Sequence, residues 1–147
     1  MNEMTALILP TASRRAPSLS QGERELMRIQ GYAAVFDLVD RAGDVFRPGA
    51  FADAGPVPLL WQHRAPPVGE VLAIGEDARG LWIEASVADP EAARLVRQGA
   101  LRGLSVGYRP LEVRQGAYRA ILRAALVEVS LVAVAMQARA RVEAVLG

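Results

Sequence analysis

The sequence contains LRGLSVGY at residues 101–108, a short apolar run with one serine between two glycines. Residues typical of a β-strand continue beyond the serine, so Ser105 is expected to lie within a strand. Glycine lacks a Cβ, and Gly103 and Gly107 would let a second extended backbone come close to this serine. Two interpretations follow: Ser105 is a nucleophile, or the two glycines are ordinary punctuation of a strand.

A serine hydroxyl is a weak nucleophile and needs a base, which in turn needs a third group to hold it. His63 is the only histidine of the chain, so it is the base if the chain uses serine–histidine chemistry. The pentapeptide GLSVG at residues 103–107 also matches the nucleophile elbow of α/β-hydrolases. That fold is rejected because the elbow needs a turn and a helix after the serine, where this sequence continues as a strand.

The composition is that of one soluble domain without cofactor or metal. The chain has 147 residues, no cysteine and one histidine, which excludes disulfides and argues against a zinc site. Its 17 basic residues, all arginine, are mixed with 16 acidic ones for a net charge of +1, so direct nucleic-acid binding is not expected. The longest apolar run, residues 124–136, is too short to span a bilayer, and the N-terminus lacks a secretory signal. A cytoplasmic protein is therefore expected.

The predicted organisation is a mobile arm at residues 1–22, rich in proline, serine and arginine, followed by a single domain at residues 23–147. Alternating patterns predict strands over residues 25–36, 57–62, 68–74, 80–87, 103–113 and 118–134. A loop over residues 37–51 is expected to end in one helical turn at residues 50–54.

Two helices are predicted. Residues 89–100 combine a good N-cap in Asp89, proline at the first helical position and a C-terminal stop at Gly99. Residues 138–146 are predicted to form a short amphipathic helix.

Glu128 lies inside the apolar segment LVEVSLV at residues 126–132, where burial without a partner would cost free energy. A strand places Glu128 and Ser130 on one face. Either this face points to solvent, or the Glu128 carboxylate orients His63.

Taken together, these features resemble the HK97-type prohead maturation proteases of tailed phages, which also occur in gene-transfer-agent particles. The shared motifs are GYAAVF at 31–36, Asp40 with GDV at 43–45, PGAF at 48–51, LWQH at 60–63, the Gly80-Leu81 hairpin, LRGLSVGY at 101–108, EVSLV at 128–132 and ARV at 140–142.

The resemblance implies a mainly β fold with α-helices, a small antiparallel β-barrel with flanking helices like that of the herpesvirus assembly proteases. It implies a serine endopeptidase that acts inside assembling capsid particles. Its substrates would be scaffold and the N-terminal segment of the major capsid protein, and a homodimer is plausible from the herpesvirus relatives. By motif position, Ser105 is the nucleophile, His63 the general base and then acid, Glu128 the third member, and Arg141 a support for the oxyanion.

Two features differ from the family pattern. The family carries proline after the last apolar strand, whereas residues 133–138 read AVAMQA, which leaves the geometry of an oxyanion loop less constrained. Many relatives also carry a scaffold-like C-terminal tail. This chain is expected to lack one and to depend on its N-terminal arm or a separate scaffold for delivery. The alternatives are a non-catalytic capsid-assembly factor of the same fold and an unrelated small β-barrel binding module.

Overall fold

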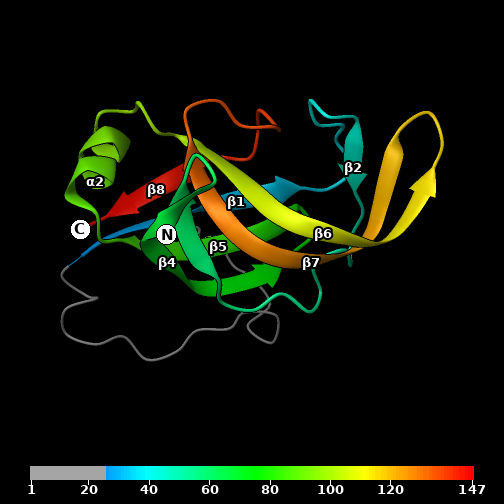
Figure 1. Ribbon diagram of the computed structural model, residues 1–147, viewed down its shortest axis with the longest axis horizontal. Helices are drawn as coiled ribbons and strands as arrows, with labels where there is room; N and C mark the ends of the chain where they lie inside the picture. The colour runs from blue at the N-terminus through cyan, green and yellow to red at the C-terminus, as the bar shows by residue number, and fades with distance from the viewer. Residues whose placement is uncertain (1–25) are drawn as a thin grey trace.

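The computed structural model describes residues 26–147, and the predicted arm at residues 1–22 lies outside them (Figure 1). Within this range the strands form one eight-stranded sheet in the order β2-β7-β3-β4-β5-β1-β8, with β6 paired to β7. The strands are β1 (Met27–Val35), β2 (Asp44–Phe46), β3 (Pro58–Trp61), β4 (Arg64–Glu76), β5 (Gly80–Val87), β6 (Gly103–Gln115), β7 (Arg119–Val132) and β8 (Val142–Leu146).

The hairpins that the sequence predicts are present. β4 and β5 pair as antiparallel neighbours, and β6 and β7 form a long curved hairpin (Figure 1). The register of the second hairpin sets Ser105 opposite Ser130 and Gly107 opposite Glu128. This hairpin therefore brings the candidate nucleophile and the buried glutamate of the sequence onto adjacent strands.

The mainly β prediction is confirmed, but the predicted closed antiparallel barrel is wrong. β7 pairs in parallel with both β2 and β3, and the sheet stays open between β6 and β8. There the backbones meet at a single bridge between Gly103 and Arg141, flanked by the bonds Leu104 N to Ala140 O (2.9 Å) and Val142 N to Arg102 O (2.8 Å). β8 then pairs with β1, so no continuous ladder closes the sheet.

The prediction of two flanking helices is also corrected. In residues 26–147 the structure has one α-helix, α2 (Pro90–Arg97), capped as predicted by Asp89, whose Oδ2 accepts a hydrogen bond from Ala92 N at 2.9 Å. Residues 50–54 form turns, and the predicted helix at residues 138–146 is replaced by β8. A helix of that length gains little by itself, whereas the edge of β1 offers backbone partners along its length.

Two prolines at residues 66–67 lie inside β4, whose pairing with β5 begins only at Gly69 opposite Val87. Their missing N–H groups therefore break no bond between β4 and β5.

The core lies inside the curved sheet, and α2 packs against one end of it (Figure 1). Its largest fully buried side chains are Phe51, Ile29, Leu59, Ile74, Leu81, Ile83, Leu104, Ile121 and Leu131. α2 adds Ala92, Ala93 and Val96 to this core. None of the helical segments in residues 26–147 has the length and hydropathy needed to cross a membrane.

Candidate active site

Ser105 lies near the start of β6, with 7% of its surface exposed. Its neighbours in the strand, Leu104 and Val106, belong to the core or pack against it. Within the described residues the Ser105 hydroxyl makes no hydrogen bond to another side chain. Gly103 is required by space, because a Cβ there would lie 2.9 Å from both a methyl group and the carbonyl oxygen of Val132.

His63 lies in a tight turn between β3 and β4. Trp61 pairs with Arg64, so Gln62 and His63 are the two central residues, with φ of 52° and 61°. Positive φ at both positions is the signature of a type I′ hairpin turn, which usually uses asparagine or glycine. A positive φ costs about 1–3 kcal/mol for each of Gln62 and His63, so contacts with the rest of the protein must stabilise the turn.

Hydrogen bonds from the turn to β7 and to the residue that follows it stabilise the turn. Gln62 N donates to Leu131 O at 2.9 Å, and Gln62 Oε1 accepts from Ala133 N at 2.8 Å. His63 N donates to Ser130 Oγ at 3.0 Å. The parallel pairing of β3 with β7 is thereby extended through the turn, which fixes the position of the His63 ring.

Glu128 points inward and contacts His63. Its Oε2 lies 2.6 Å from His63 Nδ1, and its side chain is 10% exposed against 45% for the His63 side chain. The second carboxylate oxygen, Oε1, accepts a hydrogen bond of 2.7 Å from Ser130 Oγ. Of the two interpretations of Glu128 that the sequence leaves open, the structure excludes the solvent-facing one.

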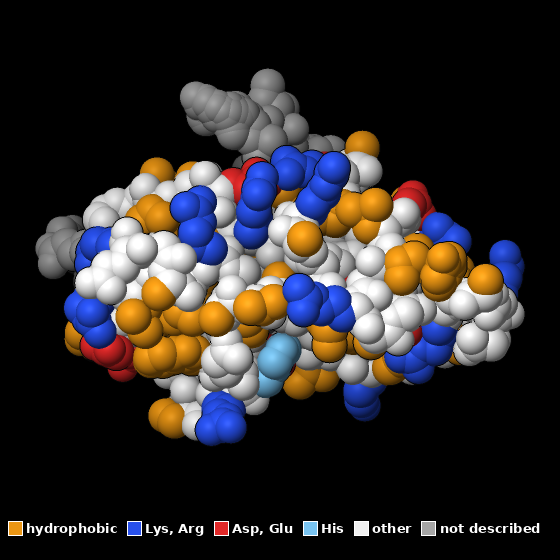
Figure 2. All heavy atoms as spheres, turned by 90° about the horizontal axis from the view of Figure 1, so that it is seen from above, with side chains coloured by type: hydrophobic (Ala, Val, Ile, Leu, Met, Phe, Trp, Pro, Cys, Tyr) orange, Lys and Arg blue, Asp and Glu red, His pale blue; other side chains and the backbone are white. Residues whose placement is uncertain are grey.

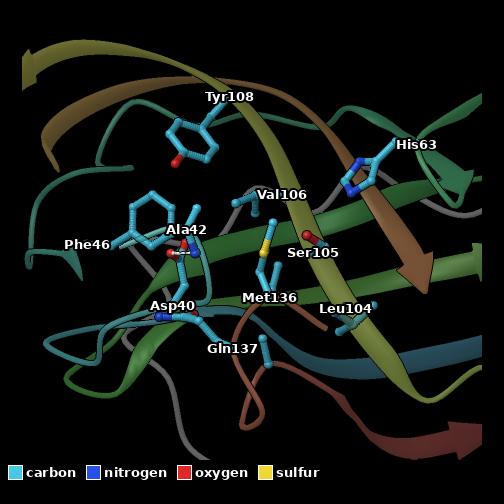
Figure 3. Close-up of a pocket in the computed structure, with 12 residues that line it drawn as sticks. Asp40, Ala42, Phe46, His63, Leu104, Ser105, Val106, Tyr108, Met136 and Gln137 are labelled. Carbon is cyan, nitrogen blue, oxygen red and sulfur yellow. Dashed lines mark hydrogen bonds between the residues drawn. The ribbon is translucent and has the colours of Figure 1, made fainter. Parts of the chain in front are cut away.

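The imidazole tautomer follows from this contact. An ionised carboxylate only accepts hydrogen bonds, so Nδ1 of His63 carries the proton that is shared with Glu128. In the neutral ring Nε2 is then the acceptor. Figure 3 shows the ring directed toward the part of β6 that carries Ser105, and both residues line one cavity of about 120 Å³.

The surroundings of this cavity are mostly apolar. Its lining comprises Ala33, Asp40, Ala42, Phe46, His63, Leu104, Ser105, Val106, Tyr108, Met136, Gln137 and Ala140. Figure 2 shows His63 at the molecular surface next to apolar and arginine side chains. The site is therefore reachable from solvent on the side of His63, while Ser105 lies deeper.

The structure does not place Arg141 in this lining. The Arg141 side chain is exposed, and the backbone of Arg141 holds the fold, since its carbonyl oxygen accepts a hydrogen bond of 3.3 Å from Tyr32 N. A Cβ on Gly31 would lie 2.2 Å from the same carbonyl oxygen, so the backbones approach closely here. The expected support of an oxyanion by Arg141 stays a prediction.

Tyr108, which lines the cavity, is bonded to an ion pair between Asp44 and Arg119. Asp44 receives hydrogen bonds from Arg119 Nε at 2.7 Å and from Arg119 Nη2 at 2.9 Å, and Tyr108 Oη donates to its Oδ2. The hydrogen bonds from Arg119 hold the pKa of Asp44 below its ordinary value. Burial and the bond to Asp44 raise the pKa of Tyr108, which stays a neutral donor.

The segment after β7 is held by one buried amide. Gln137 Oε1 accepts from Val35 N at 2.8 Å, while its Nε2 donates to Val35 O at 2.9 Å and to Leu38 O at 3.1 Å. These bonds tie the segment that carries Met136 and Ala140 to the end of β1. The sequence predicts a weakly constrained loop here because it lacks proline, and the hydrogen bonds of Gln137 constrain this loop instead.

Sequence reasoning missed two residues that shape this site, Gln137 and Arg119. They carry no local signal, because their partners Val35 and Asp44 are distant in the sequence. Gly107 and Ser130 were singled out from the sequence, but their contacts with the carboxylate of Glu128 were not predicted.

The fold is similar to that of the herpesvirus proteases. It matches Kaposi's sarcoma herpesvirus protease in complex with a hexapeptide phosphonate inhibitor, with a TM-score of 0.58 and 16% identity over 84% of this chain and 66% of that chain. A second structure, the same viral protease in complex with an allosteric inhibitor, gives a TM-score of 0.53 and 17% identity over 81% of this chain and 76% of that chain. At these identities the likeness shows the fold alone.

The sequence defines the family more narrowly. The caudovirus prohead serine protease family matches residues 13–146, and the chain belongs to that family. The prohead protease of Enterobacteria phage HK97 is 33% identical over 54% of this chain and 40% of the relative. That of Escherichia phage T5 is 27% identical over 63% of this chain and 49% of the relative. The matches thus span less than half of either relative, and the resemblance predicted from the motifs is confirmed.

Proposed function

We propose that this protein is a serine endopeptidase that cleaves scaffold or the N-terminal segment of a major capsid protein inside an assembling capsid. The observation that carries the proposal is the 2.6 Å contact between His63 Nδ1 and Glu128 Oε2 at a cavity that Ser105 also lines. In this proposal the nucleophile Ser105 lies on β6, the base His63 in the turn between β3 and β4, and the orienting acid Glu128 on β7. The relatives named as prohead proteases support the choice of substrate.

In this mechanism His63 Nε2 takes the proton of Ser105 as Oγ attacks the scissile carbonyl carbon. The C–N bond then breaks, and His63 returns the proton to the leaving amine. A water molecule, deprotonated by His63, hydrolyses the acyl-enzyme and restores the Ser105 hydroxyl. Glu128 keeps the proton on Nδ1 and stabilises the imidazolium that forms twice in the cycle.

No hydrogen bond joins Ser105 to His63 within the described residues. Such bonds often tighten only when substrate is bound, and the 45% exposure of the His63 side chain leaves a path for substrate to cover it. Backbone N–H groups are the expected oxyanion donors, and the segment that includes Arg141 is proposed to position them.

The test is processing of the cognate capsid protein by Ser105→Ala and His63→Ala variants. Each variant should fold and lose cleavage to roughly 10⁻³ of the wild-type rate or less. A fluorophosphonate probe should label the wild-type protein at Ser105. Ser86→Ala is a matched control, because Ser86 is a buried serine of the same sheet outside the cavity, and it should leave labelling and cleavage intact.

The same experiment separates the proposal from a non-catalytic assembly factor. If the protein were an assembly factor, the fluorophosphonate would label Ser105 neither in the free protein nor in assembled particles. Capsid protein would then be processed to the same extent with the Ser105→Ala variant as with the wild type. Membership of the protease family removes the other alternative, an unrelated binding module.

We also propose a weak homodimer. One solved Kaposi's sarcoma herpesvirus protease, with a TM-score of 0.51 to this chain, is in complex with a dimer disruptor. By analogy, the specific activity of this protein should rise with protein concentration. Sedimentation that shows a monomer at all concentrations, together with constant specific activity, would contradict the dimer.

A further inference from the structure

We infer that the cavity beside Ser105 binds the side chain that precedes the scissile bond, and that it selects lysine or arginine through the carboxylate of Asp40. This inference rests on the proposed function, since it names the substrate side chain that the same site would accept. Three observations carry it: the shape of the cavity, the unmet bonding capacity of Asp40, and the pairing of the neighbouring Asp44.

The cavity suits one long side chain with an apolar stem. Its volume is about 120 Å³, and a cavity of about 150 Å³ holds a benzene molecule. Figure 3 shows Ser105 at one end of the cavity and Asp40 at the other, with Met136 between them. Phe46, Val106 and Met136 give the cavity apolar walls that methylene groups would contact.

Asp40 offers a carboxylate oxygen without a partner. Only 8% of the residue is exposed. Its Oδ1 accepts hydrogen bonds from Ala42 N at 2.8 Å and Asp44 N at 2.9 Å, which hold the loop. Within residues 26–147 no donor reaches Oδ2. A buried carboxylate oxygen left unpaired is costly, and a charged nitrogen is the donor that satisfies it best.

The neighbouring acid of the same loop, Asp44, differs from Asp40 because its carboxylate is fully paired. Its carboxylate is bound by Arg119 through two hydrogen bonds and by Tyr108. The nearby amide of Gln137 is also fully used, on the backbone of Val35 and Leu38. Of the two buried acids in this loop, Asp40 is therefore the one that has no cation as a partner within residues 26–147.

A side chain that fills the cavity must reach from Ser105 at one end to Asp40 at the other. A short side chain next to Ser105 would leave Oδ2 of Asp40 without a partner behind Met136. A lysine or arginine places four or three methylene groups along the apolar walls and its charge at the far end. The competing occupant is a small apolar side chain, with Asp40 acting only as a turn former.

The first test is the cleavage preference of the wild-type protein on a peptide mixture and on its capsid protein. Peptides with arginine or lysine before the scissile bond should be cut roughly 10²-fold faster than matched peptides with leucine or alanine. A preference for small or apolar residues at that position would overturn the inference.

Asp40→Asn is the informative variant. Asparagine keeps the Oδ1 acceptor for the two loop amides and replaces only the free oxygen by an NH₂ group. Cleavage after basic residues should fall roughly 10²-fold, while labelling of Ser105 by a fluorophosphonate stays at the wild-type level and shows that the site is folded. Asp37→Asn is the matched control in the same loop, because Asp37 is exposed and pairs with Arg47.

Binding separates this inference from the proposed function. Butylguanidinium and butanol are titrated into the Ser105→Ala protein and into the Ser105→Ala, Asp40→Asn double variant, and methyl NMR signals of Met136 report occupancy. Selective binding of butylguanidinium that disappears with Asp40→Asn supports the cavity even if no peptide is cut. Absence of Asp40-dependent binding overturns it, whether or not Ser105 proves to be a nucleophile.

Discussion

Gly107 lies directly across the β6–β7 ladder from Glu128, and the carboxylate of Glu128 occupies the space where a side chain at position 107 would be. A Cβ built on Gly107 would lie 2.2 Å from Glu128 Oε2 and 2.7 Å from its Cδ. The oxygen that would be displaced is the one that contacts His63. The second glycine of the 101–108 motif is therefore explained by the acid, in addition to any approach of a substrate.

Gly107→Ala should uncouple Glu128 from His63 and lower kcat/KM by about 10²-fold or more, because an imidazole without its orienting carboxylate is a poor base. His63 is the only histidine, so its ring signals in ¹H–¹⁵N NMR are unambiguous, and the Nδ1 proton signal of the wild type should shift or vanish.

Gly116→Ala is the control for this change. It lies at the tip of the same hairpin, where the nearest atom to a Cβ is Tyr118 O at 3.8 Å, so activity and the ring signals should be unchanged. A Gly107→Ala protein with wild-type kcat/KM would show that Glu128 has no part in catalysis.

Ser130→Ala should remove the link between the backbone of His63 and the carboxylate of Glu128. Ser130 is fully buried, accepts from His63 N and donates to Glu128 Oε1, so both partners would be left unpaired. We expect the free energy of unfolding to fall by about 1–3 kcal/mol, measured by denaturant titration.

The same variant should lower kcat more than it raises KM, because it disturbs the alignment of the base while leaving the cavity wall intact. Ser86→Ala again serves as the control, since it removes a buried hydroxyl away from the site. An equal change in kcat and KM for Ser130→Ala would point to a purely structural role.

The sequence predicted most strands, because local patterns encode them. It also named four candidate residues, of which Ser105 and His63 line one cavity and Glu128 contacts His63, whereas Arg141 lies outside the lining. β5 and β6 alternate or carry glycines at recognisable places, and Asp89 with Pro90 marks the start of α2. The turn at His63 was not predictable, because Gln62-His63 is an unfavourable pair for two positive φ angles. Hydrogen bonds with Ser130 and Ala133, which are remote in sequence, stabilise it.

The wrong predictions, a helix at residues 138–146 and a closed barrel, both concern contacts between segments that are distant in the sequence. Residues 142–146 are short and ambiguous between helix and strand, and the free edge of β1 decides in favour of β8. The closed barrel implied by the resemblance depends on how the ends of β6 and β8 meet. Here they meet at one bridge, between Gly103 and Arg141, which no periodic pattern encodes.

Arg119→Met should destabilise the protein in a pH-dependent way. Hydrogen bonds from Arg119 lower the pKa of Asp44 below its ordinary value of 3.8, so the folded state binds that proton more weakly than the unfolded state. The resulting stability is present above the unfolded pKa and is lost as the pH falls through the depressed folded pKa.

At neutral pH the variant should lose about 1.5–3 kcal/mol in the free energy of unfolding, as expected for hydrogen bonds to a charged group. The difference from the wild type should shrink as the pH is lowered below about 4. Arg94→Met on the exposed side of α2 is the control, and both effects should be much smaller there, because its ion pair with Glu91 is exposed to solvent. A deficit that stays constant across this pH range would mean that Asp44 is not the partner responsible.

Gln137→Glu should loosen the segment that carries Met136 and Ala140. The two side chains have nearly the same shape, but glutamate cannot donate to Val35 O or Leu38 O and brings a charge into a site that is 5% exposed. The buried carbonyl group of Val35 and the partly buried carbonyl group of Leu38 lose their donor, so the free energy of unfolding should fall by roughly 2–4 kcal/mol at neutral pH.

Because a carboxyl group that is neutral can donate again, acidification should restore part of this loss, so that the deficit relative to the wild type is smaller at low pH than at neutral pH. Thermal unfolding at pH 7 and at pH 5 measures both effects, and Gln115→Glu, at the exposed end of β6, should change neither. If Gln137→Glu is as stable as the wild type, the segment after β7 is held by packing alone. Its hydrogen bonds would then not be what replaces the missing prolines.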